Sequence, residues 1–274
     1  MKSIIRHYNK EVLDPVINFL SRSKTFKGVS FSTDYPAPPF IVIKNNLKNY
    51  KKNILLTAGI HGNEPAGVLG LVENLNLIEN LCSKNLIQCT IIPCFNISGY
   101  KQNFRNNSKN LDLNREFYKN SQSLETSFFQ KNITEDFDFN IDFHETCPED
   151  DSDVVQAGGI LPQEFYLYEV CEEKNLRLGS LIIDGIKDLG FKTCQMPSVF
   201  GDTCIDGLIS YPEASKNPIY AQGKSLDLFL YNKKQSKNAI TIETLSHYPM
   251  EERILQIKKI LTICLNSWTF YLKI

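Results

Sequence analysis

Histidine is scarce in this sequence, which leaves few residues for any histidine-based site. The chain of 274 residues has four histidines, at positions 7, 61, 144 and 247. Long apolar runs are missing as well, because no stretch reaches the roughly 18 consecutive apolar residues of a membrane span. The opening stretch MKSIIRHYNKEVLDPV lacks the uninterrupted apolar core of a secretory signal. We therefore expect a soluble protein of the cytoplasm with no membrane partner.

An excess of either charge is also missing. The chain has 30 Lys and Arg residues against 31 Asp and Glu residues, for a formal net charge of -1. This balance argues against non-specific binding to nucleic acid, so we expect no nucleic-acid partner. The eight cysteines include no CxxC pair. In a chain of this length without a secretory signal, such cysteines are typical of reduced, mostly buried thiols in the cytosol.

Apolar runs typical of buried strands alternate with helical patterns along the chain. We expect strands at 40–45, 53–60, 87–95, 137–144 and 238–243, and helices at 11–20, 65–81 and from Pro249 onward. Residues 145–237 are harder to interpret, and 201–223 resembles long loops. The alternation predicts an α/β fold with a mixed, mostly parallel central sheet and helices on both faces. Functional residues in such sheets gather at the carboxyl ends of the strands.

The strand expected at 53–60 stops abruptly at His61-Gly62-Asn63-Glu64, and Pro65 suits the first position of a helix. Imidazole nitrogen and carboxylate oxygen are both zinc ligands, and Gly62 would let the backbone turn so that both side chains meet. One H-x-x-E pair is weak evidence by itself. The alternative is a polar helix cap, since a glutamate near a helix start is favoured by the helix dipole.

Three further segments favour the metal site over the cap. His144 closes the expected strand in D-F-H-E-T (142–146), where it could supply a third ligand. Glu243 ends the apolar strand in A-I-T-I-E (239–243), a position suited to a general base at the floor of a cleft. The stretch 103–117, NFRNNSKNLDLNREF, adds charged and amide side chains between them.

In this order and spacing the segments resemble the zinc metallocarboxypeptidase family, which shares its frame with the succinylglutamate desuccinylase and aspartoacylase group. The matching motifs are H-G-N-E (61–64), N-x-x-G (96–99), D-L-N-R (112–115), D-F-H (142–144) and T-I-E-T (241–244). The resemblance implies a zinc carboxypeptidase-like fold. We expect one catalytic domain over 1–274, with 1–50 as an N-terminal extension packed on it.

The resemblance implies one Zn²⁺ per chain, held by His61, Glu64 and His144. Asp112 would accept a hydrogen bond from a ligand imidazole, most simply that of His61, and fix its tautomer. Glu243 would take a proton from the attacking water and pass it to the leaving amine.

Other residues would handle the substrate. Arg105 would stabilise the oxyanion, and Asn114 and Arg115 would hold a substrate carboxylate. The resemblance also implies a tyrosine on a loop upstream of Glu243 that covers the site; Tyr220 and Tyr211 are the candidates, and their spacing does not separate them. Both arginines could instead be ordinary surface residues of a polar loop.

Two other residues compete as ligands. Glu145 follows His144 directly, but on a strand its side chain points to the opposite face. Cys147 lies three residues beyond His144 and could offer a soft sulfur ligand.

We expect a zinc-dependent hydrolase that cleaves an amide bond next to a free carboxylate, as a metallocarboxypeptidase acting on small peptides. The alternative is a deacylase of N-acyl amino acids of the succinylglutamate desuccinylase and aspartoacylase type. Only 31 residues follow Glu243, less than the additional domain usual in that group, which favours the peptidase. A third possibility is a catalytically silent binding module. Specificity would come from residues between about 195 and 240.

Overall fold

The computed structural model describes residues 5–30, 39–147, 160–211 and 224–266. A single turn of π-helix at Asn9–Leu13 leads into the first α-helix. The α-helices are α1 Asp14–Arg22, α2 Pro65–Glu73, α3 Leu75–Asn85, α4 Ile97–Gln102, α5 Leu124–Asn132, α7 Gly179–Asp188, α9 Leu226–Asn232 and α10 Met250–Asn266. Short 3-10 helices lie at Leu113–Arg115 and Lys174–Leu176.

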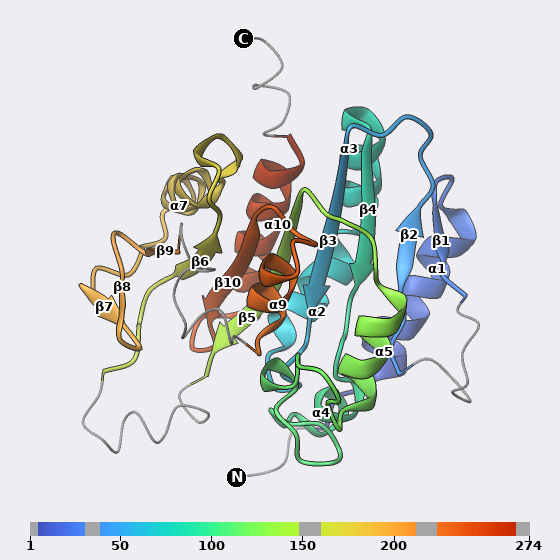
Figure 1. Cartoon of the computed structure of the whole chain (residues 1–274), viewed down its shortest axis with the longest axis horizontal. Coiled ribbons are helices and arrows are strands. Elements are labelled where there is room, and N and C mark those ends of the chain that lie inside the picture. The colour runs from blue at the N-terminus through green and yellow to red at the C-terminus, as the bar shows by residue number, and fades with distance from the viewer. Residues whose placement is uncertain (1–4, 31–38, 148–159, 212–223, 267–274) are drawn as a thin grey trace.

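An 8-stranded sheet runs through the centre of the molecule in the order β1-β2-β4-β3-β5-β10-β6-β9 (Figure 1). The pairs β3–β4, β3–β5, β5–β10 and β6–β9 are parallel. The pairs β1–β2, β2–β4 and β6–β10 are antiparallel. Its strands are β1 Phe26–Gly28, β2 Ile43–Asn45, β3 Lys52–Ala58, β4 Ile87–Ile92, β5 Phe139–Thr146, β6 Tyr166–Val170, β9 Leu208–Ser210 and β10 Ala239–Leu245. The short strands β7 Ser198–Val199 and β8 Asp202–Thr203 form a separate hairpin.

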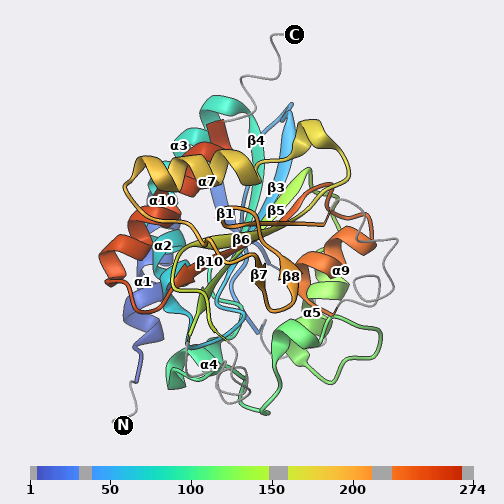
Figure 2. The ribbon, with the colours of Figure 1, turned by 90° about the vertical axis from the view of Figure 1, so that its left-hand side faces the viewer.

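Helices cover both faces of this sheet (Figure 2). On one face, α1, α2, α3, α7 and α10 bury apolar side chains against alternate residues of the strands, such as Ile54 and Leu56 of β3. On the other face, α5 and α9 pack a cluster of phenylalanines against Leu55 and Ile92. The apolar runs in the sequence reflect strands that are buried on both sides. The predicted mixed, mostly parallel α/β fold is confirmed.

Most predicted elements have somewhat different limits in the structure, and two of the differences have a clear local cause. The helix expected at 65–81 is two helices, because Asn74 leaves the helical conformation (φ -100°, ψ 11°). The Asn74 side chain donates to the carbonyl of Gly70, which ties the break to the end of α2. The strand expected at 87–95 ends at Ile92. The chain then turns toward α4 through Phe95 and Asn96, whose amides bond to Ala58 and Gly59.

The residues before 50 and the stretch 145–237, which was hard to interpret from the sequence, both contribute to the sheet. Before residue 50, β1 and β2 extend one edge of it. Between 145 and 237, β6 and β9 build the opposite edge, and α7 and α9 cover it. The loops expected at 201–223 contain β8 and β9, and residues 212–223 lie outside the described part of the chain.

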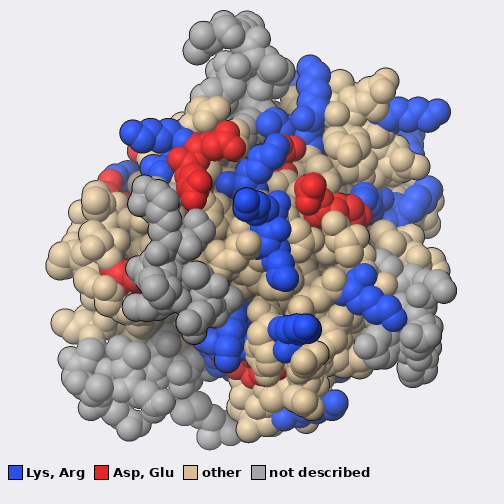
Figure 3. Space-filling model, viewed as in Figure 1, with Lys and Arg blue, Asp and Glu red and all other residues tan. Residues whose placement is uncertain are grey.

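The distribution of surface charge and the state of the cysteines agree with the expectations from the composition. Basic and acidic side chains share the face drawn in Figure 3. All eight cysteines are buried and free of disulfide bonds. Over the described ranges, every helix is too short or too polar to cross a bilayer.

Candidate metal centre and active site

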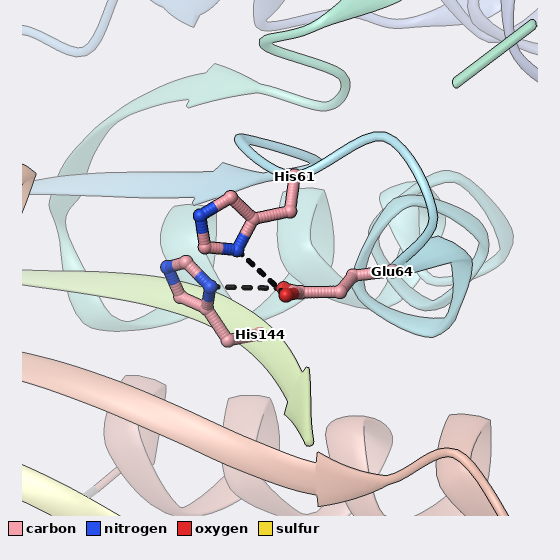
Figure 4. A group of neighbouring side chains, drawn as sticks. All are labelled: His61, Glu64 and His144. Carbon is pink, nitrogen blue, oxygen red and sulfur yellow. Dashed lines mark hydrogen bonds and ion pairs between the residues drawn. The ribbon is translucent and has the colours of Figure 1, made fainter. Parts of the chain in front are cut away.

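Three buried side chains from two segments of the chain meet at the carboxyl ends of β3 and β5 (Figure 4). His61 lies in the loop after β3, Glu64 directly precedes α2, and His144 lies near the end of β5. The Nδ1 of His61 lies 2.6 Å from Glu64 Oε1, and the Nδ1 of His144 lies 2.9 Å from Glu64 Oε2. One nitrogen or oxygen from each residue falls within 4.8 Å of the others.

Glu64 occupies the N-cap position of α2, yet its side chain makes no capping hydrogen bond. Its carboxylate turns toward the two histidines instead. The cap comes from β5, where Glu145 Oε1 accepts a hydrogen bond from the amide of Ala66 at 2.5 Å. The helix-cap alternative for Glu64 is therefore wrong, and Glu145 points away from His144 as its place on the strand requires.

Gly62 is required by close packing. A Cβ built on Gly62 would lie 2.0 Å from the carbonyl carbon of Gly99. The same backbone approach lets the amide of Gly62 donate to the carbonyl of Arg105 at 3.2 Å. Asn96 completes the arrangement, since its side chain accepts from the Gly99 amide and donates to the carbonyl of Arg105. The N-x-x-G motif thus holds the loop of Arg105 against the histidine loop.

Each histidine has its second ring nitrogen bonded to a carboxylate. His61 Nε2 lies 3.1 Å from Asp112 Oδ1, and His144 Nε2 lies 2.9 Å from Asp142 Oδ2. Asp142 is itself fixed by the hydroxyl of Thr57, which donates to Oδ1 at 2.7 Å. Such carboxylate partners set the tautomer of a ligand imidazole and orient its other nitrogen toward a metal. Both Nδ1 atoms face the same point.

Electrostatics at the group favour a cation. Burial by itself would raise the pKa of Glu64, but His61 and His144 lower that pKa well below the usual range of a carboxyl group. Burial opposes a charged imidazole at His144, but Asp142 and Glu64 raise its pKa well above the usual value. The carboxylates of Glu64 and Asp142, which raise the pKa of His144, would also attract a divalent cation held between these side chains. Two imidazoles and one carboxylate are a donor set that fits catalytic zinc.

Glu243 lies beside this group on the neighbouring strand. In the parallel pairing of β10 with β5, Glu243 stands opposite His144. Thr146 donates to Glu243 Oε2 at 3.3 Å, and the Thr146 hydroxyl shares a hydrogen bond of 2.8 Å with that of Tyr166. Burial is the main cause that raises the pKa of Glu243 to about 8, and Glu64 adds to it while His144 opposes it.

A cleft of about 530 Å³ opens over these residues. Arg105 and Arg115 lie along it, together with Asn114. Arg105 bonds through Nε and Nη2 to Asp112 Oδ2 at 3.2 and 3.1 Å, and its Nη1 lies 3.6 Å from Glu64 Oε1. Arg115 is exposed to solvent.

Asn114 contacts the wall of the cleft that includes α9, where its side-chain oxygen accepts a hydrogen bond from the amide of Leu226 at the start of the helix. Much of this wall comes from the stretch predicted to set specificity, through Phe200, Asp202, Tyr211, Lys224, Ser225, Asp227 and Leu228. Tyr211 stacks on Tyr168 with ring centroids 6.0 Å apart. Tyr220 lies outside the described residues.

Sequence reasoning gave no role to Asp142, Thr146 or Tyr166. The signal for Asp142 was available, because D-x-H on a strand places both side chains on one face. Thr146 and Tyr166 belong to strands that are joined only through β10, and nothing in the sequence linked them. Cys147 is directed elsewhere, with its sulfur 3.9 Å from the carbonyl of Asn63.

The fold is similar to that of solved metallo-carboxypeptidases. The family model of the succinylglutamate desuccinylase/aspartoacylase catalytic domain matches residues 50–155. That range holds the H-G-N-E, N-x-x-G, D-L-N-R and D-F-H motifs. The match confirms the resemblance stated from the sequence. A search of curated proteins gave no match.

Solved structures agree on the fold. A metallopeptidase candidate from Shewanella amazonensis superposes with a TM-score of 0.71 at 17% identity, over 93% of this chain and 91% of that one. A metallo-carboxypeptidase from Burkholderia cenocepacia gives 0.63 at 16% identity, over 93% and 68% of the two chains. A metallo-carboxypeptidase from Pseudomonas aeruginosa, in complex with (2-guanidinoethylmercapto)succinic acid, gives 0.63 at 14% identity over the same shares, 93% and 68%.

Proposed function

We propose that this protein is a zinc-dependent metallocarboxypeptidase that cleaves an amide bond next to a free carboxylate in small peptides. The observation that carries the proposal is the convergence of His61, Glu64 and His144 beside Glu243, at the floor of a cleft that also holds Arg115. We propose one Zn²⁺ per chain, bound by the two Nδ1 atoms and the Glu64 carboxylate. Bound zinc supplies a Lewis acid and makes a water molecule more acidic.

The protein side chains would then move the proton and hold the charge. Glu243 accepts the proton of the attacking water and delivers it to the leaving nitrogen, so that the amide becomes a carboxylate and an amine. Arg105, held by Asp112, faces the cleft and stabilises the negative oxygen that forms during attack. Water exclusion in the buried floor strengthens these interactions.

Substrate recognition rests on the D-L-N-R segment. The exposed guanidinium of Arg115 offers a fork of donors suited to a carboxylate at the cleft mouth. Asn114 adds an amide group, while its oxygen is held by α9. The Pseudomonas aeruginosa neighbour binds a succinic acid derivative, which supports a small substrate with a carboxylate. A tyrosine that closes the site, Tyr220 or Tyr211, remains part of the proposal.

A second candidate has an observation of its own. The matching family model describes succinylglutamate desuccinylase and aspartoacylase catalytic domains, which favours a deacylase of N-acyl amino acids. Both candidates use the same site and need a carboxylate beside the scissile amide, so substrate tests must separate them.

Two further parts of the proposal concern the whole chain. We propose a single catalytic domain, which is supported by β1 and β2 extending the same sheet that carries the site. A cytoplasmic location is supported by eight buried cysteines that form no disulfide.

The test combines metal analysis with a substrate panel. Purified protein should contain one zinc per chain, and the zinc-loaded protein should hydrolyse peptides with a free C-terminus faster than gamma-linked peptides or N-acyl amino acids. The reverse order would select the deacylase. A wild-type protein that binds zinc but cleaves none of them would be a binding module.

Glu243→Gln should keep its zinc and lose at least about 100-fold in kcat, because general base catalysis typically contributes that much. Glu251→Gln is the matched control, since Glu251 is an exposed carboxylate on α10 and should leave kcat unchanged. Turnover by Glu243→Gln at the wild-type rate would remove Glu243 from the mechanism.

A further inference from the structure

The first turn of α2 is held from β5. Pro65 has no amide hydrogen, so Ala66 carries the first free N–H of the helix. Since Glu64 turns away from the helix, Glu145 Oε1 accepts that N–H at 2.5 Å. The backbone amide of Glu145 also donates to Glu64 Oε2 at 3.1 Å. One residue of β5 therefore contacts both the Glu64 carboxylate and the helix turn that carries Glu64.

The second oxygen of Glu145 contacts Arg253, which comes from α10 on the outer layer of the fold. Their side chains are 0% and 11% exposed, so this ion pair is almost fully removed from water. Burying both charges carries a desolvation cost that apolar side chains of similar size would avoid. The position of Arg253 is fixed by the close packing of α10 on α2. A Cβ built on Gly70 of α2 would lie 2.7 Å from Ile257 of α10.

We propose that Glu145 and Arg253 are positioning residues for the metal ligand Glu64. Arg253 holds the Glu145 carboxylate at the start of α2, and Glu145 in turn fixes the direction in which Glu64 leaves the backbone. This inference rests on the proposed zinc site. Loss of the pair removes none of the three ligand residues but allows the Glu64 carboxylate to leave the position that faces both Nδ1 atoms.

The experiment measures zinc affinity by competition with a chelator. Arg253→Met should raise the zinc dissociation constant about tenfold, since partners behind the ligands typically contribute that much. Arg253→Lys keeps the charge and should restore affinity to within about threefold of wild type. With cobalt in place of zinc, the visible absorption of Arg253→Met should be weaker or shifted, because a ligand oxygen has moved. Arg253→Lys should keep the wild-type spectrum.

A matched control separates positioning from general stability. Glu169 on β6 is equally buried and accepts hydrogen bonds from Leu178 and Gly179 at the start of α7, away from the three ligands. Glu169→Gln should lower the thermal midpoint and leave the zinc dissociation constant unchanged. An equal loss of zinc affinity in this control would overturn the inference.

Arg253→Met leaves the buried charge of Glu145 without its partner and could unfold the protein. The double variant E145Q/R253M avoids this, because it removes both buried charges together. It should fold and bind zinc about tenfold more weakly than wild type. Wild-type affinity in Arg253→Met or in the double variant would refute positioning, and so would a failure of Arg253→Lys to restore binding. A wild-type protein that binds no zinc would instead refute the proposed function.

Discussion

At the scale of single residues, the site depends on small differences in where a side chain can fit or point. His144 and Glu145 are neighbours in sequence but face opposite sides of β5. His144 reaches Glu64 in the candidate metal centre, whereas Glu145 contacts α2 and α10. Gly62 contributes by having no side chain, which lets two loops touch through their backbones. Two predictions belong to this scale.

Gly62→Ala should destabilise the protein by about 1–3 kcal/mol, the usual cost of forcing an extra methyl group into a packed interior. Zinc content should fall as well, because the loop must move away from Gly99. Chemical denaturation and metal analysis measure both effects. Gly28→Ala is the control, since its nearest neighbour lies 3.7 Å away, and it should change stability by less than about 0.5 kcal/mol. Equal stability of the two variants would argue against the close packing.

Arg115→Ala should lower kcat/KM about 10- to 100-fold for substrates with a free carboxylate, mainly through KM, because a charged hydrogen bond is lost. Amidated substrates should be unaffected. Arg22→Ala, which removes an exposed arginine of α1, serves as the control in the same assay. A similar loss with amidated substrates would show that Arg115 has another role.

At the scale of elements, the parallel strands determine where the chemistry lies. β3, β5 and β10 end at the same edge, so residues far apart in sequence such as Glu64, His144 and Glu243 come together there. The opposite end of the same strands is held by Asp138. Its Oδ2 accepts from the amide of Asn53 at 2.9 Å, and its Oδ1 accepts from Lys237 at 2.8 Å.

The pH dependence of the stability of Asp138→Asn tests whether the Asp138 carboxylate stabilises this end of the sheet. Burial opposes ionisation of Asp138, but the bonds from Lys237 and Asn53 lower its pKa below the ordinary value. The stabilisation is therefore complete above the unfolded pKa of about 3.9 and is lost as pH falls through the lower folded value.

At pH 7 Asp138→Asn should be less stable than wild type by about 1 kcal/mol in urea denaturation, and the gap should close in acid. Asp188→Asn removes a carboxylate that is 73% exposed and should show no gap at either pH. A gap for Asp138→Asn that stays constant down to pH 2 would contradict the assignment.

At the scale of the whole molecule, a bound metal would join two distant segments of the chain, the loop of His61 and Glu64 after β3 and the end of β5. Ligand binding to the folded state alone stabilises it, by about 2.7 kcal/mol at 100 times the dissociation constant. In a protein of this size that corresponds to a rise of about 5–10 °C in the thermal midpoint.

Scanning calorimetry with and without zinc should show this rise in the wild type and a much smaller one in His61→Ala or His144→Ala. Magnesium, which prefers oxygen ligands, is the control ion. An equal shift in wild type and both histidine variants would place the zinc elsewhere.

The same three scales separate what could be predicted from what could not. The period of apolar residues predicted β3, β4, β5 and β10, and the residues at their ends, because strands buried on both faces have little tolerance for polar side chains. The break at Asn74 was missed, because apolar spacing continues across it. The strand β6 and the edge strand β9 were missed because they are short and their neighbours come from distant parts of the chain.

The sequence by itself determined the α/β class, the buried central strands and the candidate ligands His61, Glu64 and His144, since these depend on local pattern and on motif order. Only the tertiary structure decided that Glu145, and not Glu64, caps α2. It also decided that Arg253 reaches Glu145. Those choices depend on contacts between strands and helices that are far apart in sequence, and no local pattern encodes the direction of a side chain across such distances.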